Sequence, residues 1–259
     1  MAKQLYDYWF VQFDFPNEDG KPYKSSGGKM VWNEKLKREI PKGWTNARLI
    51  DIANITMGQS PAGVSYNNEG KGIVFYQGCT DFGDRFPNVR QYTTEPSRFA
   101  CKGDILMSVR APVGSLNIAN TDCCIGRGLA TLRSKIKSNT HLYFVLSDYK
   151  SFFHQCNSSG TTFGSITRED LFNLPIILPT NEVISAFEVI NTQIFEKQMV
   201  NDNTIKLLTK LRDELLPLLM NDQVSINYDF SLKLYDAICF SVILKKEILH
   251  ERIINQFNS

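Results

Sequence analysis

The stretch PTNEVISAFEVINTQIFEKQMVNDNTIKLLTKLRDELLPLLMN, from Pro179 to Asn221, determines how we expect the rest of the chain to be organised. It contains no glycine. The pair Pro179 and Thr180 is typical of the start of a helix, and Pro217 and Asn221 mark the expected end. The pattern predicts one helix over residues 180–221, roughly 60 Å long at about 1.5 Å per residue.

The apolar residues of this helix follow a heptad repeat. The a and d positions are Phe187, Ile190, Ile194, Lys197, Asn201, Thr204, Leu208, Leu211, Leu215 and Leu218. A helix of this length cannot bury its whole apolar stripe against one ordinary domain, so we expect a helix of another chain to pair with it. The expected pairing residues are Phe187, Ile190, Ile194, Asn201, Leu208, Leu211, Leu215 and Leu218. An ordinary packing helix is the alternative.

Residues 44–179 have a different pattern, in which short apolar runs are bounded by Gly, Pro, Asn or Asp. This pattern predicts a mixed α/β domain with irregular strands. We expect strands or strand-turn units at 47–55, 72–82, 104–119, 123–134 and 174–178, a helix at 141–156, and a short helix capped near Thr167. The predicted fold class is α+β, with one mixed domain followed by a long helix of the coiled-coil type.

Two further segments flank these parts. We interpret residues 1–43 as a connector arm, in which the aromatic-rich stretch Leu5–Pro16 needs to be buried and Ser25–Gly28 is a flexible hinge. Residues 222–259 have apolar residues at helical spacing, so we expect a helical tail.

The composition is that of a globular protein. The chain has 259 residues, of which 42% are hydrophobic and 22% charged, and its net charge of +2 is too small by itself to indicate nucleic-acid binding. Between Lys71 and Lys137, ten Lys and Arg stand against five Asp and Glu, a local surplus of five. This surplus indicates a basic binding surface or, alternatively, a solvated face.

The cysteines and histidines argue against a metal site. Six cysteines show no Cys-x-x-Cys spacing and the three histidines are scattered. Because we find neither a signal peptide nor an apolar run long enough to span a membrane, we expect free thiols and a cytoplasmic location.

Catalytic motifs are missing from the sequence. It contains no Gly-rich phosphate loop, no nucleophile elbow, and no Asn-Pro-Pro-Tyr or Asp-Pro-Pro-Tyr signature of an adenine methyltransferase. Two Asp-x-Lys triplets match half of a nuclease motif, but the chain has no Pro-Asp dipeptide to accompany them. We therefore expect no catalytic residue, no metal and no cofactor on this chain.

Arginine and amide side chains on glycine-flanked turns are the remaining candidates for ligand binding. Arg110 is followed closely by Pro and Gly, and Arg127 lies between two glycines, so either guanidinium could contact guanine or phosphate. The alternative is that Asp104 or Asp122 holds these arginines to brace the loops.

Amide and hydroxyl side chains extend this set. They could contact adenine edges or phosphates, although each one alone could simply be a turn residue. The predicted DNA-binding residues are Gln59, Ser60, Tyr66, Asn67, Asn68, Lys71, Gln77, Arg90, Arg110, Arg127, Thr161 and Thr162. For the pair Cys123 and Cys124 we expect burial, not catalysis, because no histidine lies near them in the sequence.

Several segments of the chain resemble one protein family. They are IPKGW (40–44), GQSP (58–61), SVRAPVGSLNIA (108–119), CIGRGLA (124–130), GSITREDL (164–171) and LRDELLPLLMNDQV (211–224). Their order and spacing resemble the DNA specificity (S) subunits of type I restriction-modification systems, in which a target recognition domain precedes a conserved spacer helix.

The resemblance implies a subunit without catalysis of its own. Such a subunit reads one half of a bipartite site in double-stranded DNA and recruits modification (M) subunits, which use S-adenosylmethionine, and restriction (R) subunits, which use ATP. Full-length members have two recognition domains and two helices, whereas this chain has room for one of each. We therefore expect a half-sized S subunit that pairs through its helix with a second copy or another S half. The alternatives are a stand-alone nuclease or DNA methyltransferase, and a protein-binding coiled-coil scaffold.

Overall fold

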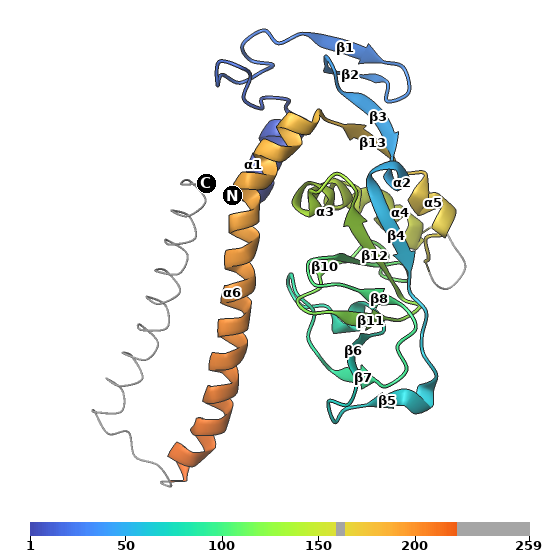
Figure 1. The fold of residues 1–259 in the computed structure, drawn as a ribbon, viewed down its shortest axis with the longest axis vertical. Coiled ribbons are helices and arrows are strands. Elements are labelled where there is room, and N and C mark those ends of the chain that lie inside the picture. Colours follow the sequence, from blue (N-terminus) through green and yellow to red (C-terminus); the bar gives the residue numbers. More distant parts are fainter. Residues whose placement is uncertain (159–163, 222–259) are drawn as a thin grey trace, which may run out of the picture. The chain divides into compact units, whose positions relative to one another are not determined.

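The computed structural model describes residues 1–158 and 164–221. The chain divides into two units, Met1–Asp202 and a second unit that begins at Asn203. Figure 1 shows the two larger sheets of the first unit next to each other, with short helices at the far end of one of them. The predicted α+β arrangement, a sheet-rich domain followed by a long helix, is confirmed.

A four-stranded antiparallel sheet forms the centre of the domain. Its strands, in order, are β10 (Leu116–Ile118), β9 (Ile105–Ser108), β12 (Leu129–Ser134) and β4 (Ala53–Met57). All four residues of strand β9 are buried. Because successive side chains point to opposite sides of a strand, both faces of β9 are covered. Ile105 and Met107 join the larger core cluster, while Leu106 joins a second cluster shared with the neighbouring sheet.

A five-stranded sheet adjoins this second cluster. Its strands, in order, are β5 (Tyr66–Asn67), β7 (Gln91–Thr93), β6 (Ile73–Tyr76), β11 (Cys123–Ile125) and β8 (Phe99–Ala100). The pairing of β11 with β6 is parallel, so both strands end at the same edge of the sheet. Cys123 and Cys124 are fully buried here, as expected, and burial raises the pKa of the Cys123 thiol to about 12.

Two small antiparallel pairs complete the strands. They are β1 (Met30–Asn33) with β2 (Arg38–Pro41), and β3 (Thr45–Arg48) with β13 (Pro175–Leu178). The second pair joins the start of the domain to the segment that leads into the long helix. The expected single strand at 47–55 is wrong, because one helical turn, α2 (Leu49–Ile52), separates β3 from β4. Asp51 causes this break by accepting a hydrogen bond from the Arg48 backbone N–H at 3.0 Å.

The helices of the second half of the domain lie where helical spacing predicted them, with one difference. The expected helix at 141–156 is two helices, α3 (Asn139–Asp148) and α4 (Lys150–Ser158), which separate at Tyr149. The short helix α5 (Arg168–Phe172) begins as predicted at Thr167, whose side chain accepts a hydrogen bond from the Asp170 N–H.

The aromatic stretch near the N-terminus is part of the main core. It forms α1 (Ala2–Tyr6) and a π-helical turn (Asp7–Val11). Buried members of this segment, Tyr6, Trp9, Phe10, Phe13 and Phe15, pack in one cluster with the domain. The sequence predicted that this stretch needs burial, and the domain itself supplies the burying surface. The segment expected as a hinge is also held, because Asp14 accepts hydrogen bonds from Ser25 at 2.7 and 2.6 Å.

The long helix α6 spans Asn181–Met220. Pro217 lies inside the helix and not at its end, and the Asn221 N–H donates to the Pro217 carbonyl at 3.1 Å. Phe187 is fully buried and packs against Phe10 with ring centroids 4.9 Å apart. The sequence predicted that Phe187 pairs with a helix of another chain. That prediction is corrected, because the Phe187 side chain already belongs to the core of its own chain.

Candidate nucleic-acid interface

Three loops meet at the edge where β6 and β11 both end. They are residues 58–60 after β4, residues 77–78 after β6, and residues 126–128 between β11 and β12. Backbone hydrogen bonds join them: Gly58 N–H donates to the Leu129 carbonyl at 2.9 Å, and Gly126 N–H donates to the Tyr76 carbonyl at 2.8 Å. Segments far apart in the sequence are thus fixed against one another through their backbones.

Glycine is required for this close approach. A Cβ atom built on Gly58 would lie 2.2 Å from the Gly126 carbonyl oxygen, and one on Gly128 would lie 2.7 Å from the Gln77 carbonyl oxygen. Both distances are far below an ordinary carbon–oxygen contact of roughly 3.3 Å. Glycine at these positions therefore lets the loops touch, and the contact holds the side chains on either side of each glycine in place.

A fourth and a fifth loop join the first three. Val109 N–H donates to the Gly128 carbonyl at 2.9 Å, and Ile166 N–H donates to the Val109 carbonyl at 3.1 Å. Arg110 forms an isolated antiparallel bridge with Ser165. We call residues 58–60, 77–78, 109–111, 126–128 and 164–166 together the loop cluster.

Arg110 and Arg127 line one groove in the loop cluster, which we call the arginine groove. Its volume is about 540 Å³. The lining residues are Met57, Val109, Arg110, Ala111, Arg127, Gly164, Ser165 and Ile166. Both arginines are exposed, and within the described residues no acid pairs with either of them. The groove therefore offers two unpaired guanidinium groups.

The two acids considered as braces have other partners. Asp104 is 4% exposed and accepts a charge-assisted hydrogen bond from Arg133 Nε at 2.5 Å. This contact is the first cause of the raised pKa of Arg133. Asp122 accepts a hydrogen bond from the Lys102 backbone N–H at 2.8 Å. Neither acid braces Arg110 or Arg127.

The predicted amide and hydroxyl residues of the loop cluster have exposed or half-exposed side chains. Gln59 and Gln77 are both exposed. The Ser60 hydroxyl accepts a hydrogen bond from the Arg127 backbone N–H at 3.2 Å, so it positions the turn that carries this arginine. Exposed amides and guanidinium groups on one fixed backbone are suited to base edges and phosphates.

The turn at residues 66–71 uses several predicted residues for its own structure. Asn67 donates to the Lys71 carbonyl at 2.8 Å and accepts from the Lys71 N–H at 3.0 Å, so this amide holds the turn. The Tyr66 hydroxyl donates to the Pro61 carbonyl at 2.9 Å, and the Lys71 amine pairs with Glu69 at 2.6 Å. Asn68 is exposed.

Of the last three predicted DNA-binding residues, the structure describes one. Arg90 is exposed and donates to the Thr80 carbonyl at 3.2 Å, close in sequence to the Gln77 turn. Thr161 and Thr162 lie outside the described residues.

Two residues with supporting roles were missed. Asp81 accepts from the Gln77 N–H at 2.8 Å, and Ser97 donates to the Gln59 carbonyl at 2.6 Å. The position of Asp81 four residues after Gln77 in a turn was a usable signal, because a carboxylate at that spacing can accept a backbone N–H. No local pattern indicates Ser97, because its partner is 38 positions away.

The described part of the chain shows neither a metal-binding cluster nor a membrane-spanning helix. Among residues 1–158 and 164–221, no three His, Cys, Asp or Glu side chains gather in a way that could hold a metal ion. No described helix has both the length and the hydropathy needed to cross a membrane.

Comparison with known proteins identifies the family. Residues 41–216 match the family described as type I restriction modification DNA specificity domain. Among curated proteins, the putative type I restriction enzyme MjaX specificity subunit of Methanocaldococcus jannaschii is 34% identical over 195 residues, which are 73% of this chain and 45% of the relative. The MjaIX specificity subunit of the same organism is 26% identical over 243 residues, 87% of this chain and 52% of the relative.

Solved structures agree with this result. The HsdS subunit from Thermoanaerobacter tengcongensis has a TM-score of 0.55 and 32% identity, over 85% of this chain and 50% of that one. A chain from a study of complex assembly in the type I R-M system has a TM-score of 0.53 and 33% identity, over 84% and 51%. This chain spans about half the length of the relatives it matches. Because the family model covers most of the chain and the relatives agree with it, the chain belongs to the type I restriction-modification DNA specificity family.

Proposed function

We propose that the loop cluster reads one half of a bipartite site in double-stranded DNA. The observation that carries this proposal is the placement of Gln59, Gln77, Arg110 and Arg127 on one set of loops fixed by backbone hydrogen bonds. Arginine suits guanine and glutamine suits adenine in the major groove, and both also bind phosphate.

The charge of the loop cluster supports this proposal. None of its five segments contains an acid, and the two guanidinium groups of the arginine groove lack acidic partners among the described residues. An unpaired guanidinium can form bidentate contacts with a base or with phosphate without first losing an ion pair. Backbone fixation reduces the conformational entropy that the loops lose on binding.

We propose that the chain has no catalytic role of its own and carries neither cofactor nor metal. In this proposal it recruits modification subunits, which hold S-adenosylmethionine, and restriction subunits, which hold ATP. The curated relatives are named as specificity subunits of type I restriction enzymes, which supports a recognition role. The expected result is that the isolated chain transfers no labelled methyl group from S-adenosylmethionine to DNA. Methyl transfer by the pure chain would contradict this assignment.

We propose further that α6 pairs with a second copy or with another S half. Leu208, Leu215 and Leu218 remain 49%, 40% and 37% exposed, and Leu211 is partly exposed. These heptad residues therefore remain accessible to a partner helix, unlike Phe187. A substitution that places a charge at the seam, Leu215→Glu, should convert dimers to monomers in sedimentation. Unchanged dimers would place the contact elsewhere.

The test of DNA reading uses arginine variants and a matched control. A duplex is first selected from a random pool, and binding is then followed by fluorescence anisotropy at low and high salt. Arg110→Ala and Arg127→Ala should each weaken binding of the selected duplex by about 1 to 3 kcal/mol if the arginine reads a base. A phosphate contact would instead weaken all duplexes alike and reduce the salt dependence.

Arg48→Ala provides the control, because Arg48 is an exposed arginine on β3 that pairs with Asp51 outside the groove. This variant removes the same charge and should bind the selected duplex like the parent chain. Equal losses in all three variants would mean that net charge alone drives binding. Normal binding by both groove variants would remove the arginine groove from the interface.

A further inference from the structure

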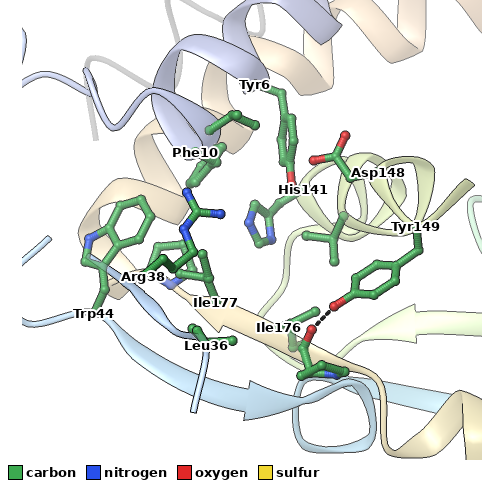
Figure 2. A pocket seen from close by; sticks show the side chains of 14 residues that line it. Tyr6, Phe10, Leu36, Arg38, Trp44, His141, Asp148, Tyr149, Ile176 and Ile177 are labelled. Atoms are coloured by element: carbon green, nitrogen blue, oxygen red, sulfur yellow. Dashed lines mark hydrogen bonds between the residues drawn. The ribbon is translucent and has the colours of Figure 1, made fainter. Parts of the chain in front are cut away.

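Most aromatic side chains of the domain are packed within their own chain. In the pocket drawn in Figure 2, the Phe10 and Trp44 rings lie 5.9 Å apart, and the Tyr149 hydroxyl donates to the Pro175 carbonyl. Phe99 differs from them, because it is 54% exposed. A single exposed apolar residue is common on a protein surface, so the surroundings of Phe99 decide what its ring can do.

The segment that carries Phe99 is tied directly to the loop cluster. Ile125 N–H donates to the Arg98 carbonyl at 2.9 Å, and the Ile125 carbonyl accepts from the Gln59 N–H at 3.1 Å. The Ser97 hydroxyl also donates to the Gln59 carbonyl at 2.6 Å. The backbone next to Phe99 is therefore held against Gln59, one of the proposed DNA-reading residues.

The Phe99 side chain lies on the face of the sheet that meets the loop cluster. Cys124 is the register partner of both Phe99 and Phe75, so these three side chains share one face. Ala100, the next residue of β8, is buried in the core on the other face. Phe75 reaches the loop cluster, because a Cβ atom built on Gly126 would lie 3.1 Å from Phe75 Cζ. Phe75 is 1% exposed, whereas Phe99, on the edge strand β8, remains uncovered on the same face.

The chemistry of DNA limits what an exposed phenyl ring can contact beside Gln59. In the major groove the base edges present hydrogen-bond donors and acceptors, and the apolar group among them is the 5-methyl of thymine. The sequence neighbour Arg98 is exposed, and positive charge beside the ring favours DNA as the partner. We propose that Phe99 contacts the 5-methyl group of a thymine in the recognised half-site. This proposal rests on the proposed function of the loop cluster, and it adds a specificity contact that uses no hydrogen bond.

Deoxyuridine tests this contact, because it pairs like thymidine and lacks only the methyl group. The whole chain is bound to the duplex selected from the random pool, and each thymine of one half-site is replaced in turn by deoxyuridine. Replacement of the contacted thymine should weaken binding about fourfold in fluorescence anisotropy, the effect expected for one buried methyl group. A selected half-site without thymine on either strand, or without a position that responds to deoxyuridine, would overturn the proposal.

Variants of Phe99 assign the contact to this ring. Phe99→Ala should bind the thymine duplex at least about fourfold more weakly and should no longer distinguish it from the deoxyuridine duplex, whereas Phe99→Leu should still distinguish them. Phe152→Ala is the matched control, because Phe152 is 39% exposed on α4 and lines a pocket with Tyr149 and Pro175 outside the loop cluster. This control should keep both the affinity and the response to deoxyuridine. Circular dichroism checks that each variant is folded.

The outcomes separate failure of this contact from failure of the proposed function. A chain that selects no sequence from the pool would refute DNA reading and the thymine contact together. A chain that selects a half-site but binds its deoxyuridine duplexes equally well would refute the thymine contact alone. Equal weakening of the thymine and deoxyuridine duplexes by Phe99→Ala would show that the ring contacts sugar or stacks on a base. Normal DNA binding by Phe99→Ala would leave the ring to a protein partner, and either of these last two results overturns the methyl contact.

Discussion

Replacing Gly58 by alanine tests whether the loop cluster acts as one fixed surface. The new Cβ would lie 2.2 Å from the Gly126 carbonyl oxygen and 2.8 Å from the Leu129 carbonyl oxygen. An ordinary carbon–oxygen contact is roughly 3.3 Å, so the loops must separate by about 1 Å. Both neighbours are backbone atoms, so no side chain can rotate out of the way. We expect Gly58→Ala to lower the unfolding free energy by about 1 to 3 kcal/mol, as overpacking does.

Gly58→Ala should also weaken DNA binding in chains that remain folded. Separation of these loops shifts Gln59 and Arg127 relative to each other while both side chains remain present. Base contacts depend on geometry, so we expect the selected duplex to bind about tenfold or more weakly, a loss of about 1.4 kcal/mol or more. Fluorescence anisotropy measures binding, and urea denaturation followed by circular dichroism measures stability and confirms the fold.

Gly63→Ala is the matched control. Gly63 belongs to the segment that follows Gly58, and its new Cβ would meet no atom within 4 Å. The same chemical change should therefore leave DNA binding unaltered and keep stability within about 1 kcal/mol of the parent chain. The reasoning is refuted if Gly58→Ala binds the selected duplex as tightly as Gly63→Ala does.

Two other predictions concern the core and the long helix. Burial lowers the pKa of His141 to about 4 from its ordinary value of 6.5. The stability present above pH 6.5 is therefore lost as the pH falls towards 4. Between pH 7 and pH 5 the unfolding free energy of the parent chain should fall by about 2 kcal/mol more than that of His141→Phe. Parallel urea titrations at the two pH values measure this, and equal losses would contradict it. Inserting one heptad after Asn201 adds roughly 10 Å to each helix of an antiparallel pair, so the spacer of an interrupted palindromic site should grow by roughly three base pairs. Selection from a random pool with and without the insert measures the spacer, and an unchanged spacer with intact dimers would show that the helix does not set it.

Periodicity predicted the elements that local pattern can specify. The helix expected at 180–221 is α6, and the apolar runs at 104–119 and 123–134 contain the strands β9 to β12. The expected strand at 47–55 failed because the Asp51 carboxylate accepts a hydrogen bond from the Arg48 backbone N–H, which favours a helical turn over apolar alternation. A local capping contact can thus override a hydrophobic pattern.

The loop cluster shows what the sequence could indicate but not specify. Glycines on both sides of Arg127 suggested a backbone that approaches something closely, yet nothing in the local sequence shows that the approach is to Gly58 and Gln77. Asn67 has the same amide chemistry as a base-reading residue, but its hydrogen bonds to Lys71 use it within its own turn. The hydrogen bonds of the folded chain distinguish an amide that is open to DNA from one that is used within its own turn.

The heptad of α6 combines two different roles, and burial distinguishes them. Phe187 is fully buried in the core of its own chain, and Ile194 packs against the same core, whereas Leu208 and Leu215 are 49% and 40% exposed. A heptad pattern records which residues need an apolar neighbour, but it does not record which chain supplies that neighbour. The first part of the repeat therefore anchors α6 to the recognition domain, and the later leucines carry the proposed pairing. It follows that Leu215→Glu should separate dimers without lowering the stability of the domain, while Phe187→Ala should lower stability by about 3 to 5 kcal/mol.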